Sequence, residues 1–235
     1  MHLPFEQFSA LKAIGICRHV FTQRIPGIDV SHDKTEVLER LDAAHREIRN
    51  AVGMGDWPLF TAEQIHGNNI ALIEKVESAR CADRTPQRGI PTKEFPACDG
   101  IITKQLGVAL GIYVADCCAV YVVDPKTPAI GLVHSGRKGT ELGVVTNALR
   151  QMIDRFASDP AEMILQLSPC IRPTHYEVDF AADIIVQCRA LGVHQIHDSG
   201  ICTACDLERY YSYRTEMGKT GRMLAVMGLQ RANAH

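Results

Sequence analysis

Three residues that can bind a metal, or act as nucleophile and base, each lie at the end of a predicted β element: His66, Cys117 and His134. Two imidazoles and one thiolate form a ligand set that zinc accepts, and three protein ligands with one open position are typical of a catalytic zinc site. Their spacing matches no local zinc motif, so the site depends on a fold that brings three strand ends together. The same residues allow a second interpretation, in which Cys117 is a nucleophile and His134 is its base.

Each of these residues also has an interpretation without chemistry. His66 lies at a predicted hairpin tip, where a solvated turn residue is the commoner case. Cys117 and Cys118 can be two small core residues, because free cysteine is often buried. The sequence leaves these alternatives open beside the metal site.

A basic, glycine-containing turn follows His134 and leads into a predicted helix. A strand-to-helix loop presents free backbone N–H groups and the positive end of the helix dipole, and Arg137 and Lys138 add charge. We expect this turn to bind an anion, with phosphate as the first candidate, although its glycine spacing is not that of a P-loop. An ordinary solvated helix start is the alternative.

A second group of zinc-type ligands lies near the C-terminus, with His194 and His197 spaced HxxH and Cys202 and Cys205 spaced CxxC. A single CxxC is only moderately specific, and this arrangement differs from the common zinc fingers. A structural zinc site is one interpretation, and a buried or redox-inactive cysteine pair is the favoured one.

The composition excludes several classes of protein. The 235 residues include 25 basic and 27 acidic ones, a net charge of −2, which argues against a general attraction to nucleic acid or anionic membranes. No apolar run reaches the roughly 18–20 residues of a membrane helix. Nine cysteines cannot all pair within one chain, and residues 1–21 lack a secretory signal pattern. We therefore expect unpaired or metal-bound thiols in a reducing, cytoplasmic compartment.

Hydrophobic patterning predicts more strands than helices. Residues 62–66 and 70–75 are expected to pair as a hairpin around a turn at 67–69. One helix is expected to follow Ser31 or Asp33, either of which can cap it. The other predicted strands are residues 19–24, 101–103, 108–114, 119–123, 129–134, 163–167 and 223–229, and the other predicted helices are residues 140–156, 179–191 and, shorter, 207–214.

The order of these elements predicts an α+β fold, because the strands do not alternate strictly with helices. Helices are expected to cover central sheets in a single domain over residues 1–235. Residues 78–97 have no periodicity and three prolines, and they predict a long surface loop.

Several short motifs occur in a recognisable order between about residues 15 and 229. They are QIHG at 64–67, CDGIIT at 98–103, VADC at 114–117, HSG at 134–136 with GT at 139–140, Pro169 with YEV at 176–178, CTACD at 202–206, YSYR at 211–214 and TGR at 220–222. In this pattern the chain resembles the YfiH-type laccase-domain family, also called the polyphenol oxidase or peptidoglycan editing factor family.

The resemblance implies a layered α-β-β-α sandwich with mixed central sheets and zinc ligands at His66, Cys117 and His134. It implies phosphorolysis of adenosine, inosine, guanosine and methylthioadenosine to the free base and ribose-1-phosphate, and deamination of adenosine is also associated with the family. Older family names imply copper-dependent oxidation of phenols. Another family name implies an enzyme that edits peptidoglycan precursors, and in that case Cys117 and His134 would act as a Cys–His hydrolase. The expected partners are a nucleoside and phosphate, with no nucleic acid or membrane, for a monomer or homodimer.

Phosphorolysis requires a phosphate held beside a ribose that becomes cationic. Arg137 and Lys138 are candidates for this role, together with Arg24, which lies where the family carries an N-terminal arginine. Asp116 is expected to orient a metal-binding side chain by a hydrogen bond, without contacting the metal itself. The family's HAGWRG motif is HSGRKG here, so Arg137 replaces a stacking tryptophan and Lys138 replaces a fork-shaped guanidinium.

Overall fold

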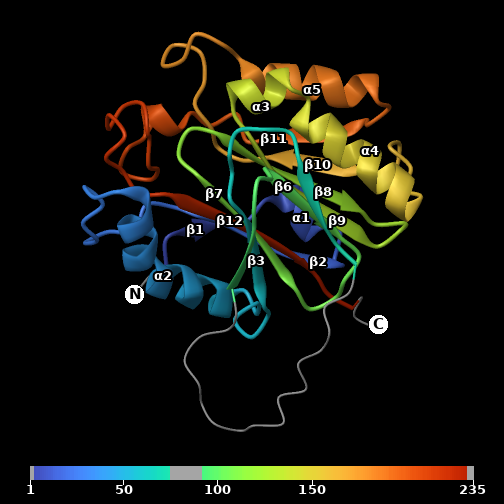
Figure 1. The fold of residues 1–235 in the computed structure, drawn as a ribbon, viewed down its shortest axis with the longest axis horizontal. Coiled ribbons are helices and arrows are strands. Elements are labelled where there is room, and N and C mark those ends of the chain that lie inside the picture. The colour runs from blue at the N-terminus through green and yellow to red at the C-terminus, as the bar shows by residue number, and fades with distance from the viewer. Residues whose placement is uncertain (1–2, 75–91, 232–235) are drawn as a thin grey trace, which may run out of the picture.

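Two six-stranded sheets form the centre of the molecule, and helices cover both outer faces (Figure 1). The computed structural model describes residues 3–74 and 92–231. Both sheets contain parallel and antiparallel neighbours, which confirms the predicted α+β sandwich with mixed sheets. No helix in these two ranges has the length and apolar character needed to cross a membrane.

The first sheet has the order β1-β2-β12-β7-β3-β5. Its strands are β1 (Phe5–Glu6), β2 (Cys17–Thr22), β12 (Met223–Leu229), β7 (Ala109–Val114), β3 (Leu59–Ala62) and β5 (Thr92–Phe95). The C-terminal strand β12 lies between β2 and β7, so the two ends of the chain are joined in one sheet.

The second sheet has the order β11-β10-β8-β9-β6-β4. Its strands are β11 (Gln195–Asp198), β10 (Ile164–Leu167), β8 (Cys118–Asp124), β9 (Ala129–Ser135), β6 (Gly100–Thr103) and β4 (Ile70–Ile73). Every residue of β8 and β9 is buried, as expected for apolar strands covered on both faces.

The helices divide between the two outer faces (Figure 1). Helix α2 (Lys34–Ala51) belongs to the layer of the first sheet, and the Asp33 side chain caps it by accepting from Thr35 N–H and Glu36 N–H. Helices α3 (Arg137–Glu141), α4 (Val144–Phe156) and α5 (Phe180–Ala190) cover the second sheet. The shorter α1 (Ser9–Lys12) and the 3-10 helix η1 (Thr203–Cys205) complete the set in the described ranges.

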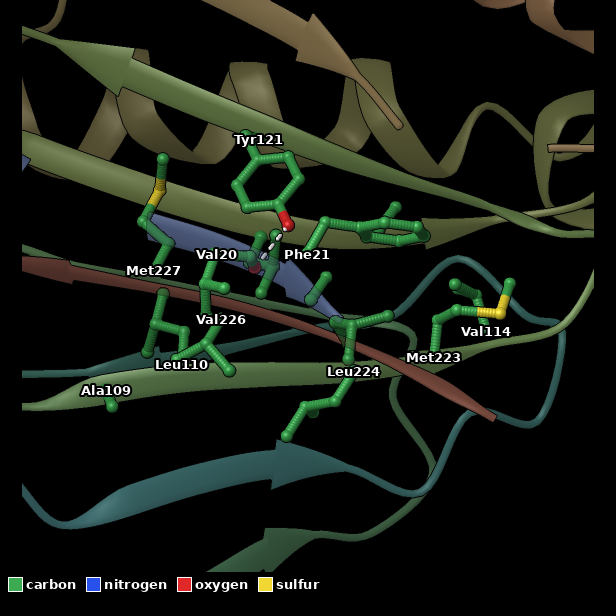
Figure 2. Packing of buried hydrophobic residues seen from close by; sticks show 14 of the residues in the cluster. Val20, Phe21, Ala109, Leu110, Val114, Tyr121, Met223, Leu224, Val226 and Met227 are labelled. Atoms are coloured by element: carbon green, nitrogen blue, oxygen red, sulfur yellow. Dashed lines mark hydrogen bonds between the residues drawn. The ribbon is translucent and has the colours of Figure 1, made fainter. Parts of the chain in front are cut away.

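A continuous apolar core fills the space between the sheets. Figure 2 shows Val20, Phe21, Leu110 and Val226 within this cluster, with Tyr121 reaching in from β8. The Tyr121 hydroxyl donates a hydrogen bond to the carbonyl of Val20 on β2 over 2.9 Å. This hydrogen bond therefore joins the two sheets through a largely apolar layer.

The predicted hairpin around residues 67–69 is wrong. Strand β3 pairs with β5 and β7 in the first sheet, whereas β4 pairs with β6 in the second. The intervening segment 63–69 therefore crosses from one sheet to the other. Two short apolar runs around a glycine-containing turn look like a hairpin, and only their partners elsewhere in the chain decide otherwise.

Three further predictions need correction. The single helix over residues 140–156 is two helices, because Gly143 adopts a left-handed φ of 69° between α3 and α4. Residues 207–214 form turns instead of a helix. Within the predicted loop 78–97, Thr92–Phe95 forms strand β5, while residues 78–91 lie outside the described residues.

Candidate active site

The crossing segment 63–69 carries His66 toward the second sheet. Gln64 and His66 both have left-handed backbone φ angles, of 64° and 60°, which non-glycine residues adopt only where their surroundings impose it. The Gln64 side chain imposes part of this geometry, because its amide donates to Tyr113 O and its carbonyl accepts from Tyr113 N. Gln64 therefore anchors the segment to β7.

Cys117 immediately precedes β8, and His134 lies near the end of the neighbouring strand β9. Cys118 pairs with Ser135 in the antiparallel register, so Cys117 lies beside Gly136 at the end of the ladder. A side-chain methyl at Gly136 would meet the Cys117 Sγ at 2.6 Å. Glycine at this position is thus what lets the β9–α3 turn approach the thiol so closely.

The three residues singled out by their chemistry converge. The donor atoms of His66, Cys117 and His134 all lie within 4.8 Å of one another. The Cys117 Sγ is 3.9 Å from the His66 Nε2, and the two imidazole rings meet edge to face with centroids 4.8 Å apart. Sites of this kind hold a metal through one thiolate and two imidazoles.

Asp99 supports this group and was not among the predicted site residues. Its buried carboxylate accepts from the His134 Nδ1 over 2.9 Å and from the backbone N–H groups of His66 and Gly67. His134 therefore keeps its Nε2 as the free donor atom, and the His66 loop is held by the same carboxylate. The signal was present in CDG at 98–100, an acidic residue at the start of a fully buried strand.

The charges of these groups depend on one another. Burial alone would raise the pKa of the Cys117 thiol, but His134 and His66 outweigh this effect and hold that pKa well below its usual range. Burial alone would lower the pKa of His134, but Cys117 and Asp99 raise it instead. A readily formed thiolate suits both a metal ligand and a nucleophile.

The group lies at the wall of a cavity of about 600 Å³, a size typical of small-molecule sites. Aromatic side chains line it from several elements: Tyr113, Tyr176, Phe180 and Tyr213. Cationic side chains also line it: Lys34, Arg137, Arg214 and Arg222. The cavity thus combines apolar ring surfaces with positive charge next to the three donor atoms.

Comparison with known proteins identifies the family. The family model described as multi-copper polyphenol oxidoreductase laccase matches residues 8–186 and 178–230. The chain belongs to this laccase-domain family. This confirms the resemblance drawn from the sequence motifs.

Relatives of this laccase-domain protein carry the name purine nucleoside phosphorylase. YlmD of Geobacillus stearothermophilus, so named, is 27% identical in an alignment that covers 86% of this chain and 82% of that protein. The purine nucleoside phosphorylase SCO2081 of Streptomyces coelicolor is 27% identical over 79% of this chain and 81% of its own.

Solved structures show the same laccase-domain fold. YlmD from Geobacillus stearothermophilus superposes with a TM-score of 0.78 at 23% identity and covers 97% of this chain and 99% of that chain. The hypothetical protein YfiH of Bacillus licheniformis gives a TM-score of 0.75 at 22% identity, covering 91% of this chain and 93% of that chain. The layered arrangement is therefore that of the family.

The predicted phosphate-binding residues of this laccase-domain protein differ in whether they line the cavity. The Arg24 guanidinium donates to Glu216 and Tyr210 O and stacks over Tyr211, and Arg24 does not line the cavity. Arg137 lies at the cavity but forms ion pairs with Glu141 and Glu177.

Lys138 borders a shallower hollow beside the cavity. Helix α3, which follows the basic turn, has only five residues. The dipole that this helix contributes to anion binding is therefore that of little more than one turn.

Lys34, Arg214 and Arg222 line the cavity but were not predicted, and Arg222 is the guanidinium among them without a carboxylate partner in the described ranges. It lines the cavity, its Nη1 donates to Thr220 O and Gly221 O, and it forms no salt bridge to a carboxylate in the described ranges. Its motif TGR was part of the family resemblance, so the signal existed without an assigned role.

Asp116 has a different role from the one expected. Its carboxylate accepts from the Thr203 hydroxyl and from Arg214 N–H, each over 2.7 Å, so it joins two loops at the cavity wall. The carboxylate that contacts a histidine of the candidate site is that of Asp99, at His134 Nδ1.

The donor set suits a borderline-soft metal such as zinc. One thiolate and two imidazoles are held together, and one of the imidazoles has its second nitrogen fixed by a carboxylate. The group is therefore a candidate metal centre, and copper also accepts N and S donors.

Proposed function

We propose that this laccase-domain protein is a zinc-dependent purine nucleoside phosphorylase acting on adenosine, inosine, guanosine and methylthioadenosine. The observation that carries the proposal is the convergence of His66, Cys117 and His134 beside a cavity that also holds aromatic rings and Arg222. The names of the relatives support the same reaction. Zinc bound by the three residues would supply a Lewis acid for a substrate oxygen.

In this reaction a phosphate oxygen forms a bond to C1′ of the ribose while the bond from C1′ to the purine nitrogen breaks. The electron pair leaves with the base, which takes up a proton, and the products are the free base and ribose-1-phosphate. The ribose becomes cationic on the way, so an anion held beside it is stabilising.

Residues of this chain can hold both reactants. Arg222 is suited to the phosphate because a guanidinium forms paired hydrogen bonds to phosphate oxygens. In our proposal Arg137 and Lys138 lie at the rim of this subsite, and ion pairs with Glu141 and Glu177 reduce the charge that Arg137 offers. Tyr176, Phe180 and Tyr213 offer ring faces for the purine.

The test is release of hypoxanthine from inosine by zinc-loaded protein, followed by chromatography with and without phosphate. We expect release that requires phosphate and that falls at least 100-fold in His66→Ala, with His197→Asn, an exposed histidine remote in sequence, as the control. Release that is equal without phosphate, or absent, would contradict phosphorolysis. Conversion of adenosine to inosine in the same samples tests the associated deaminase activity.

A second candidate is a Cys–His hydrolase that acts on peptidoglycan precursors. The observation in its favour is the series Asp99, His134 and Cys117, in which a carboxylate orients a base next to a thiol of lowered pKa. Metal-free protein that keeps full activity but is inactivated by thiol alkylation would support this candidate over the phosphorylase.

Copper-dependent oxidation of phenols is the third candidate function. His66, Cys117 and His134, called the His66 centre below, supply one set of three donor atoms. Reduction of oxygen to water by a laccase requires several coppers. Oxygen consumption by copper-loaded protein in the presence of a phenol tests it directly.

A further inference from the structure

A second group of metal-type donors lies outside the three-residue centre. The His175 Nδ1 is 3.5 Å from the Cys205 Sγ and 3.8 Å from the Cys202 Sγ, and all three donor atoms lie within 4.8 Å of one another. The residues come from two loops: His175 from the β10–α5 connection, and the two cysteines from the ends of the segment that contains η1. None of the three takes part in the proposed phosphorylase chemistry.

The backbone holds these two loops together. Cys170 N–H donates to Ile201 O, and Thr203 N–H donates to Cys170 O, both over 3.2 Å. The Thr203 side chain, between the two cysteines, is further fixed by its hydrogen bond to Asp116. The donor atoms are therefore brought together by bonds that do not depend on a metal, and a cation would find a partly organised site.

Side-chain chemistry then selects the ligand. Two thiols and one imidazole bind borderline-soft cations such as zinc, and they bind magnesium or calcium poorly. The His175 and Cys205 side chains are exposed and Cys202 is half-buried, so a metal can enter from solvent and a water can complete the coordination. Exposure on this side also distinguishes the group from buried cysteines that serve only as packing.

We infer that His175, Cys202 and Cys205 form a second zinc site that fastens the loop 170–176 to the loop 201–206. The histidine ligand is not one of those suggested by the HxxH spacing. His197 lies on β11, and neither it nor His194 belongs to this group of donors.

The position of the site gives it a structural consequence. Ile171 and Tyr176 line the large cavity, and Asp116, bonded to Thr203, lines it too. A metal that joins the two loops would therefore stabilise one wall of the cavity without touching its three-donor centre. This inference is independent of the proposed function, since it concerns a different set of ligands.

Metal analysis of protein purified in reductant and equilibrated with zinc tests the site. We expect the double variant Cys202→Ser/Cys205→Ser to hold one zinc per chain fewer than wild type, and His175→Gln to bind that zinc more weakly. The matched control is His197→Asn, which should keep the wild-type content. Equal zinc content in wild type and the double variant would overturn the inference, whatever the His66 centre binds.

Cobalt loading gives a readout that assigns the ligands. In a Cys117→Ser background, a thiolate-to-cobalt absorption band should persist, and it should disappear when Cys202 and Cys205 are also replaced. Absence of the band in Cys117→Ser, or a Cys202–Cys205 disulfide that persists in reductant, would contradict the site. Because the three side chains are exposed or half-buried, thermal unfolding of the metal-free variants should match that of metal-free wild type.

Discussion

At the scale of single residues, the candidate centre depends on groups that never touch a ligand. Asp99 is fully buried and bonds both His134 and the backbone of the His66 loop. Gly136 provides the space beside Cys117. Each of these residues can be changed without removing a donor atom, and so each tests the geometry separately from the chemistry.

Asp99→Asn should weaken zinc binding at the His66 centre by about 10–100-fold, because the amide no longer offers His134 a charged acceptor. The measurement is competition with a chromophoric chelator. Asp116→Asn is the matched comparison, since Asp116 bonds Thr203 and Arg214 and no histidine. A larger loss in Asp116→Asn than in Asp99→Asn would reverse the two roles assigned above.

Gly136→Ala should also reduce zinc binding and turnover, because the added methyl would lie 2.6 Å from the Cys117 Sγ and must displace it. Gly67→Ala is the control, because a methyl there meets its nearest atoms at 3.4 Å. Zinc content and hypoxanthine release are measured for both variants. Equal behaviour of the two would mean that the turn has room to adjust.

At the scale of elements, strand β2 contains a buried histidine. His19 accepts a hydrogen bond from Phe8 N–H over 2.7 Å and contacts the rings of Phe8 and Tyr121. Burial, together with the nearby charge of Lys12, lowers its pKa from 6.5 to about 4. The neutral imidazole is therefore part of the packing between α1 and the sheets.

Acid should destabilise the fold through this histidine. Between pH 6.5 and about 4 the unfolded chain binds a proton that folded His19 does not, so the free energy of unfolding falls as the pH decreases through this window. His19→Gln should remove about 2–3 kcal/mol of the loss between pH 7 and pH 4.5, as measured by urea unfolding. His45 is also buried with its pKa lowered to about 4, so part of the loss remains.

The exposed His197→Gln serves as the control for this series. Its stability should follow the wild-type pH dependence. An unchanged pH dependence in His19→Gln would show that the imidazole is not what responds to acid.

At the scale of the whole molecule, the two six-stranded sheets pack face to face over the apolar core. The Tyr121 hydroxyl crosses the core to Val20 O (Figure 2). Tyr121→Phe should lower the free energy of unfolding by about 1–2 kcal/mol, because a buried carbonyl loses its donor while the ring still packs. Chemical denaturation measures this, with Tyr213→Phe, at a side chain more than half exposed, expected to be neutral.

Most strands and the helices α2 and α5 could be predicted because their patterns are local. The predicted strand 223–229 coincides with β12, and the predicted cap Asp33 precedes α2. The segments 62–75 and 140–156 were misread for a different reason. Whether two adjacent strands pair, or a helix breaks at Gly143, depends on partners and backbone angles that local periodicity does not encode.

By itself, the sequence determined which residue types are available for chemistry: it contains His66, Cys117, His134, a CxxC pair and the family motifs. The family resemblance implied that His66, Cys117 and His134 act together, and only the tertiary structure decided how they meet and which other residues join them. The segment that crosses between the sheets brings His66 to Cys117 and His134 at the second sheet, with Asp99 bonded to His134. Arg222 lines the cavity and Arg24 does not. The CxxC cysteines lie beside His175 instead of His194 or His197. The physical reason is that these contacts join residues far apart in the chain, and their geometry is set by strand register and loop crossings.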